Sequence, residues 1–293
     1  MHITRRSFLQ TSAVGLGLPF VRLPNASRVR FGYAAITWNG KDVQAMEDIA
    51  ALGFPGIQLR SGILPTYEKQ PDVLRRLLGQ HGLKFVALSS GNVSVDPAKR
   101  SATIEEHVAH ARFVRDAGGM YLQLIDEKPK DRAVTPDDIA RLGDTLSEIG
   151  RRAADLGVMS GYHHHMGTIG ETPDATERVL AASDPRYVKL LLDVAHYAQG
   201  GGDPVAAIRR HRDRLLFLHI KDVEPRGTGY RFVELGQGRV DLKGVFSALA
   251  DVSFDGWAVV ELDSVPDNAR TPKEAGAVNK KFLEGLGFDV SVR

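Results

Sequence analysis

Residues 189–222 read KLLLDVAHYAQGGGDPVAAIRRHRDRLLFLHIKD, which is two apolar runs separated by a short amphipathic stretch. The runs at 189–196 and 215–222 have the length and continuous apolar character of strands that are buried on both faces. The stretch between them, 204–212, has helical periodicity. Parallel strands joined by a helix form a βαβ unit, so this segment predicts a parallel sheet covered by helices.

The same alternation runs through most of the chain. Strands are predicted at 30–38, 56–61, 84–90, 120–126, 158–165, 189–196, 215–222 and 257–263, and helices at 42–52, 72–81, 104–117, 136–156, 173–182, 204–212, 242–251 and 272–286. Eight such βα units in about 260 residues are typical of a closed (β/α)8 barrel, the TIM barrel. An open, doubly wound sheet is the alternative, but it normally carries a Gly-rich phosphate turn after its first strand. The sequence AAITWNGKD at 34–42 has no such turn, so we predict a single-domain TIM barrel over residues 30–290.

The composition excludes several classes of function. The chain has 293 residues, of which 43% are hydrophobic and 25% charged, as in an ordinary globular protein. It has no cysteine, which excludes disulfides, thiolate metal sites and cysteine nucleophiles. The net charge is +2, without a basic run, so no nucleic acid is expected as a partner.

The N-terminus has the pattern of an export signal. The sequence TRRSFLQ at 4–10 precedes a weakly apolar stretch, TSAVGLGLPFV at 11–21, which resembles a twin-arginine signal. The apolar stretch is too short to span a bilayer, so stable membrane association is not expected. We predict a signal peptide over residues 1–26 and a periplasmic or otherwise exported protein. The alternative is a disordered basic tail.

Polar residues gather at the ends of the last four predicted strands, where a TIM barrel places its functional groups. They are His163, His164 and His165 in the fifth strand, Asp193 and His196 in the sixth, His219, Lys221 and Asp222 in the seventh, and Glu261 and Asp263 in the eighth. Burying such groups without partners is costly, so we expect them to compensate one another or to share a cation. The predicted metal ligands are His163, Asp193, His219 and Glu261.

The residue types narrow the choice of metal. A mixed set of imidazoles and carboxylates suits Mn²⁺, Co²⁺, Zn²⁺ or Mg²⁺, with the imidazoles arguing against a pure Mg²⁺ or Ca²⁺ site. Taken singly, each residue can also be a hydrogen-bonded polar group at the barrel mouth. His164 is expected to point to the opposite face of its strand and to pack on a helix. The histidines outside these strands are predicted to be solvated or capping: His2, His81, His107, His110 and His211.

Five motifs resemble a known family. They are YHHHMGT (162–168), LLLDVAH (190–196), FLHIKDV (217–223), LGQGRVDL (235–242) and FDGWAVVELD (254–263). In this order and spacing they resemble the xylose isomerase-like sugar phosphate isomerase/epimerase superfamily, and are most similar to its inosose (2-keto-myo-inositol) dehydratase branch. The resemblance implies a (β/α)8 barrel with one divalent cation, often Mn²⁺ or Co²⁺, at its C-terminal mouth. It implies that Asp193, His219 and Glu261 are metal ligands and that His196 contacts substrate.

The chain departs from the pattern of these relatives at two strands. His163 stands where many relatives have a glutamate ligand, and Glu171 in the following loop is the alternative fourth ligand. Gln58 stands where an acidic residue is common in the second strand. An export signal is unusual for an enzyme of cytoplasmic inositol catabolism, so a different keto-sugar is also considered.

The function implied by the resemblance is removal of a proton next to the carbonyl of a keto-sugar or cyclitol. A divalent ion would stabilise the enediolate, Glu261 or His165 would be the base, and Lys221 or His196 would donate to an oxygen. We expect β-elimination, as in an inosose dehydratase or a 3-keto-glycoside lyase. The alternative is an isomerase or epimerase working through the metal-stabilised enediolate. Remoter alternatives are zinc-dependent phosphodiester cleavage and a non-catalytic periplasmic sugar-binding protein.

The remaining predictions concern substrate contacts and assembly. The predicted substrate-binding residues are Trp38, His196, Lys221 and Asp222. The segment EPRGTGYRFVELGQG at 224–238 either closes over substrate or connects the seventh strand to the next helix. The substrate is expected to be a small keto-sugar or cyclitol, and a homo-oligomer is possible.

Overall fold

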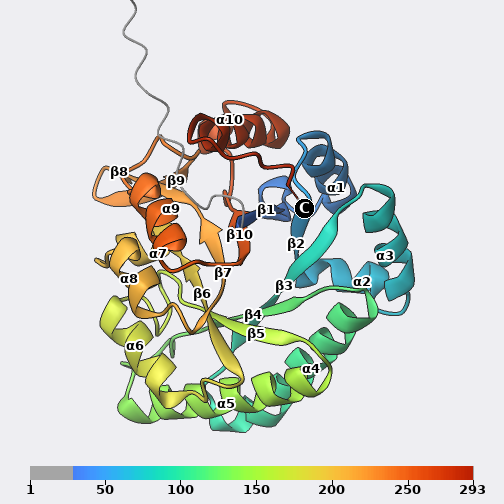
Figure 1. The fold of residues 1–293 in the computed structure, drawn as a ribbon. Helices are drawn as coiled ribbons and strands as arrows, with labels where there is room; N and C mark the ends of the chain where they lie inside the picture. The colour runs from blue at the N-terminus through green and yellow to red at the C-terminus, as the bar shows by residue number, and fades with distance from the viewer. Residues whose placement is uncertain (1–28, 293) are drawn as a thin grey trace, which may run out of the picture.

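The computed structural model describes residues 29–292 and shows a closed parallel barrel enclosed by helices (Figure 1). The strand order around the barrel is β1-β10-β7-β6-β5-β4-β3-β2, which confirms the predicted TIM barrel. The strands are β1 (Val29–Ala34), β2 (Gly56–Arg60), β3 (Lys84–Val93), β4 (Tyr121–Asp126), β5 (Met159–His163), β6 (Val188–Asp193), β7 (Leu215–Ile220) and β10 (Gly256–Val260). The predicted signal peptide at 1–26 lies outside the described residues.

The helices form the outer ring of the molecule. They are α1 (Asp42–Ala51), α2 (Leu64–Tyr67), α3 (Pro71–Gln80), α4 (Arg100–Asp116), α5 (Pro136–Asp155), α6 (Pro173–Ala182), α7 (Val194–Gln199), α8 (Pro204–Arg210), α9 (Leu242–Asp251) and α10 (Pro272–Gly285). In α5, Ile139, Leu142, Leu146 and Ile149 follow helical spacing and are buried against the barrel. Between residues 29 and 292, no helix is both long enough and apolar enough to cross a membrane.

The barrel strands are apolar up to their last residues, and this pattern positions the functional groups. In β6, Leu190, Leu191 and Leu192 are fully buried, as expected for a parallel strand covered on both faces. The first polar side chain that follows them is Asp193, at the strand's carboxyl end. Each neighbouring strand likewise delivers its polar side chain to the same mouth of the barrel.

Several predicted strands end earlier than expected, and at β5 and β6 this changes where a site residue lies. Strand β6 ends at Asp193, because its Oδ1 accepts hydrogen bonds from the backbone N–H groups of Ala195 and His196 and thereby starts α7. His196 therefore lies on a helix. Strand β5 ends at His163, so that His165 lies in the following loop.

An antiparallel hairpin occupies much of the segment at 224–238, for which no strand was predicted. Its strands are β8 (Asp222–Arg226) and β9 (Gly229–Val233), and they form a separate two-stranded sheet beside the barrel. Gly227, in the turn between them, has a φ of 58°, which a glycine adopts without strain. The hairpin brings Phe232 to the barrel mouth, as described below.

Two of the histidines outside the strands are buried. For His107 the prediction of a solvated or capping role was wrong, whereas His211 is the C-cap residue of α8, in agreement with that prediction. His107 is fully buried on α4, with Nδ1 2.6 Å from Ser90 Oγ. Burial lowers the pKa of His107 to about 4, so its ring is neutral. His211 is 8% exposed and lies 2.9 Å from a carboxylate oxygen of Glu177.

Candidate metal centre

The four predicted metal ligands come together at the carboxyl ends of four neighbouring strands. His163 ends β5, Asp193 ends β6, His219 lies in β7, and Glu261 directly follows β10. One possible ligand atom of each lies within 4.8 Å of those of the others, and all four side chains are buried. His219 Nδ1 is 3.4 Å from Asp193 Oδ2 and 3.4 Å from Glu261 Oε1. The geometry therefore allows a single ion to contact all four residues.

Three polar atoms of this cluster lack hydrogen-bond partners among the described residues. Asp193 Oδ2, His163 Nδ1 and His219 Nδ1 are buried without a donor or acceptor. Burial lowers the pKa of His163 well below its usual value, so its ring is neutral. Burial alone would raise the pKa of Asp193, but neighbouring groups, among them the charged Lys221, hold it well below its usual value. Since a buried anionic oxygen without a donor is unfavourable, this donor set fits a divalent cation.

A buried glutamine pair orients His219. Its Nε2 donates to Gln58 Oε1 at 2.9 Å, and Gln58 Nε2 donates to Gln123 Oε1 at 2.6 Å. The hydrogen is therefore on Nε2, which leaves the lone pair of Nδ1 facing Asp193 and Glu261. A hydrogen bond of this kind to the outer nitrogen of a ligating histidine is common in metal sites. Gln58, at which the chain departs from the family pattern, thus helps to orient a residue of the cluster.

Replacing Gln58 by leucine is expected to lower the affinity for a divalent ion about 10- to 100-fold, because His219 loses the partner that fixes its tautomer. Competition with a metal-binding dye measures this affinity. Gln123→Leu is the matched control, because Gln123 contacts Gln58 and not the cluster, and its effect should be smaller. Equal affinities for wild type and Gln58→Leu would contradict this role.

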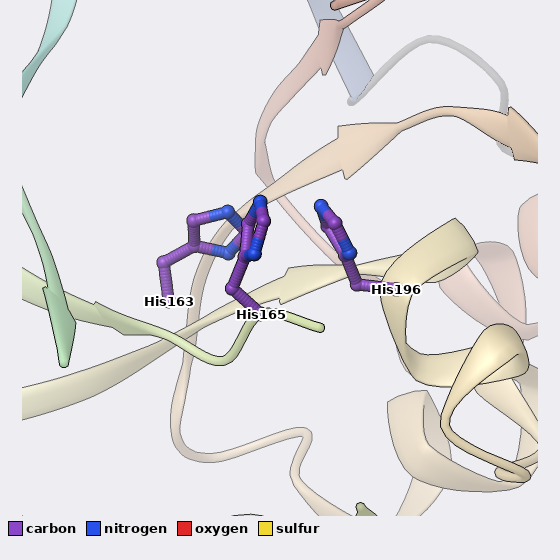
Figure 2. Close-up of side chains that lie close together, drawn as sticks. All are labelled: His163, His165 and His196. Carbon is purple, nitrogen blue, oxygen red and sulfur yellow. The ribbon is translucent and has the colours of Figure 1, made fainter. Parts of the chain in front are cut away.

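His165 and His196 form a close pair beside the cluster, with their ring planes tilted by 42° to each other. Figure 2 shows their rings close to each other and to His163, and the ring centroids of His165 and His196 are 3.7 Å apart. The carbonyl of Met166 accepts a hydrogen bond from His165 Nδ1 at 2.7 Å, and the N–H of Met166 donates to His196 Nδ1 at 3.3 Å. Because a carbonyl only accepts and an amide N–H only donates, the two rings are held in opposite tautomers. His165 has a free lone pair on Nε2, whereas His196 has its hydrogen there.

These tautomers help to decide whether a second group of residues binds a metal ion. His163, His165 and His196 also place ligand atoms within 4.8 Å of one another. However, the hydrogen on His196 Nε2 makes that atom a donor, and it is buried without a partner. Burial lowers the pKa of His196 well below its usual value, so the ring is neutral. The group therefore fits a base and a hydrogen-bond donor for a substrate better than a second ion.

Lys221 is fully buried and connects the cluster to the barrel rim. Its Nζ donates to Glu261 Oε1 at 2.9 Å and to Asp263 Oδ1 at 2.6 Å, and lies 4.0 Å from the ring centre of Phe232. Burial by itself would lower the pKa of Lys221, but the carboxylates of Glu261 and Asp263 raise it above its usual value. Lys221 is therefore charged and orients Glu261.

A cavity of about 150 Å³ opens in front of the cluster. Among its lining residues are Gln58, Arg60, His165, Glu261 and Asp263. Two predicted active-site residues, His165 and Glu261, thus face the same space. This cavity is where a substrate can reach Glu261 of the cluster and His165 of the histidine pair.

Trp38 is not among the residues brought to this cavity. Strand β1 ends at Ala34, and Trp38 closes a 3-10 turn (Ala35–Trp38) in which it is 3% exposed. Its Nε1 donates to Asp48 Oδ2 at 2.9 Å, and its ring packs edge-on against Tyr33 at 5.6 Å. Trp38 is a core residue in this structure, in contrast to the predicted substrate contact.

Asp222 organises a loop and does not contact the cavity. It is fully buried, and its carboxylate accepts hydrogen bonds from four backbone N–H groups, those of Val223, Gly236, Gly238 and Val240. A Cβ on Gly238 would overlap the Asp222 carboxylate, so a glycine is required there. The predicted role in substrate binding is therefore replaced by a structural one.

Replacing Asp222 by alanine is expected to lower the free energy of unfolding by about 3 kcal/mol or more, because several N–H groups lose their acceptor. Chemical denaturation measures this loss. Asp241→Ala is the control: Asp241 is an N-cap whose side chain accepts one backbone N–H, and its loss should cost about 1 kcal/mol. A similar small loss for both variants would contradict the structural role of Asp222.

The structure separates the two candidates for the fourth ligand. Glu171 forms an ion pair with Lys128 and is not part of the cluster, whereas His163 is. His164 is buried and packs edge-on against Tyr197 of α7 at 5.3 Å, on the helix side as predicted.

Sequence reasoning missed two residues that support the site, Gln123 and Phe232. Gln123, like Gln58, is a buried polar residue that interrupts an apolar strand, which is the same signal that identified Asp193. Phe232 packs against His196 with ring centroids 4.8 Å apart, and it also covers Lys221. No signal pointed to Phe232, because the hairpin that carries it was not predicted.

Comparisons with known proteins agree with this fold. The family described as xylose isomerase-like TIM barrel matches residues 46–281. The chain is 27% identical to an inosose dehydratase of Lacticaseibacillus casei over 297 residues, which cover 87% of this chain and 96% of that protein. The crystal structure of IOLI protein with a bound zinc atom has a TM-score of 0.74 at 22% identity, covering 88% of this chain and 98% of that one. An L-ribulose 3-epimerase structure also has a TM-score of 0.74, at 20% identity, covering 88% and 94%.

Proposed function

Since the chain belongs to the xylose isomerase-like TIM barrel family, we propose that it is a metal-dependent enzyme that removes a proton next to the carbonyl of a keto-sugar or keto-inositol and then eliminates the β-oxygen. The observation that carries this proposal is the pair of opposite tautomers at His165 and His196, beside a buried set of unpartnered metal-ligand atoms. The similarity to inosose dehydratases supports it.

The residues that would hold the ion are His163, Asp193, His219 and Glu261. When bound there, a divalent ion supplies Lewis-acid polarisation of the substrate's carbonyl oxygen. Mn²⁺ or Co²⁺ is proposed as the ion, with Zn²⁺ and Mg²⁺ as alternatives, because the donor set mixes imidazoles with carboxylates.

The chain's own residues would move the proton. His165 Nε2 has a free lone pair and faces the cavity, so it takes the proton from the carbon next to the carbonyl. The C–O bond at the β carbon then breaks, and the departing oxygen receives the proton from His165. The Nε2–H of His196 stabilises that oxygen by a hydrogen bond. The products are an unsaturated ketone and water or an alcohol.

Elimination is favoured over epimerisation by the placement of the proton-transfer groups. An epimerase returns a proton to the opposite face of the carbon, which requires a second base across the substrate. His165 and His196 lie next to each other on one side, and the carboxylate of Glu261 is held by Lys221. Lys221 is therefore proposed to position Glu261 and to donate a hydrogen bond to a neighbouring substrate oxygen.

The test is to load the protein with Mn²⁺ or Co²⁺ and to supply 2-keto-myo-inositol and methyl 3-keto-glucoside. The expected result is growth of the ultraviolet absorbance of an unsaturated ketone with at least one of them, abolished by chelation. Exchange of the substrate's hydrogen with deuterated water, without this absorbance, would show an isomerase or epimerase. Binding that survives chelation, without turnover, would show a sugar-binding protein.

We also propose that residues 1–26 direct export of the protein by the twin-arginine route. Replacing Arg5 and Arg6 by lysine in the full chain is expected to keep the protein in the cytoplasm, because the paired arginines are the recognised feature. Cell fractionation measures this. An unchanged distribution would contradict the proposal.

A further inference from the structure

A second cavity adjoins the one at the cluster. It measures about 610 Å³ and shares two wall residues, Ile125 and His165, with the cluster cavity of about 150 Å³. Ligand sites commonly measure about 300–1,000 Å³, so the smaller cavity has room for a single small ring. His165 therefore stands at the border between a space for one ring and a larger space beyond it.

Both walls of the second cavity are fixed by one buried carboxylate. Asp126, at the end of β4, accepts hydrogen bonds from the hydroxyl of Tyr162 at 2.7 Å and from the backbone N–H of Ile169. These bonds tie the loop after β5 to the end of β4. A Cβ on Gly170 would overlap the Tyr162 hydroxyl, so only glycine fits at this position of the loop. The cavity is thus part of the rigid barrel mouth.

The lining of the second cavity combines polar side chains with the apolar side chains of Ile125 and Pro129. Besides Asp126 it includes the amide of Asn92, the ammonium groups of Lys128 and Lys130, and the backbone of Gly167. Lys128 is paired with Glu171, whereas no carboxylate of residues 29–292 forms an ion pair with Lys130. None of the lining residues is a phenylalanine, tyrosine or tryptophan. Such a mixed surface suits a sugar, whose hydroxyl groups form hydrogen bonds with the polar side chains and whose C–H groups pack on the apolar ones.

We propose that the second cavity binds the leaving half of the substrate, and that this half is a second sugar, so that the substrate is a keto-disaccharide. This inference rests on the proposed function. His165 takes the proton from the keto ring at the cluster, the C–O bond to the second sugar breaks, and the released oxygen receives the proton from His165. An unsaturated keto-sugar and a free sugar result, without an oxidant or reductant. The scissile bond then lies where His165 does, between the two cavities.

The kinetic test compares a 3-keto-disaccharide of two glucose units with methyl 3-keto-glucoside. The wild type is expected to turn over the disaccharide with a kcat/KM at least about 10-fold higher, because only the disaccharide fills the second cavity. Lys130→Ala and Asn92→Ala should each remove most of this preference and leave the methyl glycoside unaffected. Lys99→Ala is the control, because Lys99 lines a neighbouring cavity only.

A binding measurement tests the cavity without turnover. Glucose, titrated calorimetrically, is expected to bind the wild type with equal affinity before and after chelation of the metal, and to bind Lys130→Ala more weakly. Turnover of the methyl glycoside without preference for the disaccharide would overturn this inference alone. Silence on both glycosides with turnover of 2-keto-myo-inositol would also overturn this inference alone, whereas silence on all three compounds would contradict the proposed function. Absence of glucose binding would overturn the second-sugar site.

Discussion

Replacing His165 by asparagine is expected to lower kcat about 100- to 10,000-fold with metal content unchanged, because general bases contribute about that factor. The asparagine amide nitrogen can still donate to the Met166 carbonyl, as His165 Nδ1 does. It has no counterpart of Nε2, the atom that carries the free lone pair. The variant therefore removes the base and keeps the local hydrogen bond. Steady-state kinetics with whichever keto-substrate is turned over measures the loss.

The control for this variant is His81→Asn, a histidine at the end of α3 that is remote from the barrel mouth. It should have wild-type kcat and KM. If His165→Asn also retained wild-type kcat, the assignment of the base would be wrong, and Glu261 would become the candidate. A fall in both activity and metal content would instead place His165 among the metal ligands.

Replacing Asp193 by asparagine is expected to lower the metal affinity by more than about 100-fold and to leave the fold intact. The two carboxylate oxygens of Asp193 have different tasks. Oδ1 accepts the N–H groups of Ala195 and His196 at the start of α7, and Oδ2 faces the cluster. Asparagine can keep the cap through its amide oxygen, but it removes the negative charge that a cation requires. Metal titration by calorimetry and thermal denaturation of the metal-free form separate the two effects.

Asp203→Asn is the matched control for this substitution. Asp203 caps α8 in the same way, with Oδ1 accepting from the N–H groups of Val205 at 2.8 Å and Ala206 at 3.2 Å, and it is not part of the cluster. Asp203→Asn should change the free energy of unfolding by less than about 1 kcal/mol and should leave the metal affinity unchanged. Equal metal affinities for Asp193→Asn and Asp203→Asn would exclude Asp193 as a ligand.

The barrel was predictable because its strands are buried on both faces and therefore stand out as continuous apolar runs between amphipathic helices. Helix α9 was predicted with its observed bounds, Leu242–Asp251. The β8–β9 hairpin was not, because Pro225, Gly227 and Gly229 made its sequence look like a connecting loop. The hairpin is stabilised by its position beside the barrel mouth. A local sequence pattern does not indicate this position.

The cluster was predictable for a related reason. Asp193 and Glu261 each end an apolar run, and buried charged groups in such places need partners. The direction in which a side chain points was harder to predict than its place near a strand end. If a strand ends one or two residues earlier than predicted, the side chains that follow point to a different face. Trp38 and Asp222 lie close to strand ends, as expected, yet point into the core and into a loop. The tautomers of His165 and His196 depend on the backbone of Met166 and could not be read from the sequence.

Elemental analysis of purified protein tests the central claim most directly, by comparing wild type with His219→Ala and with the control His211→Ala. His211 is also buried, but it lies beside Glu177, away from the cluster. We expect about one equivalent of divalent metal in wild type and in His211→Ala, and almost none in His219→Ala. A metal content in His219→Ala equal to that of wild type, or a wild type that takes up no metal from a saturating solution, would contradict the shared cation on which this account depends.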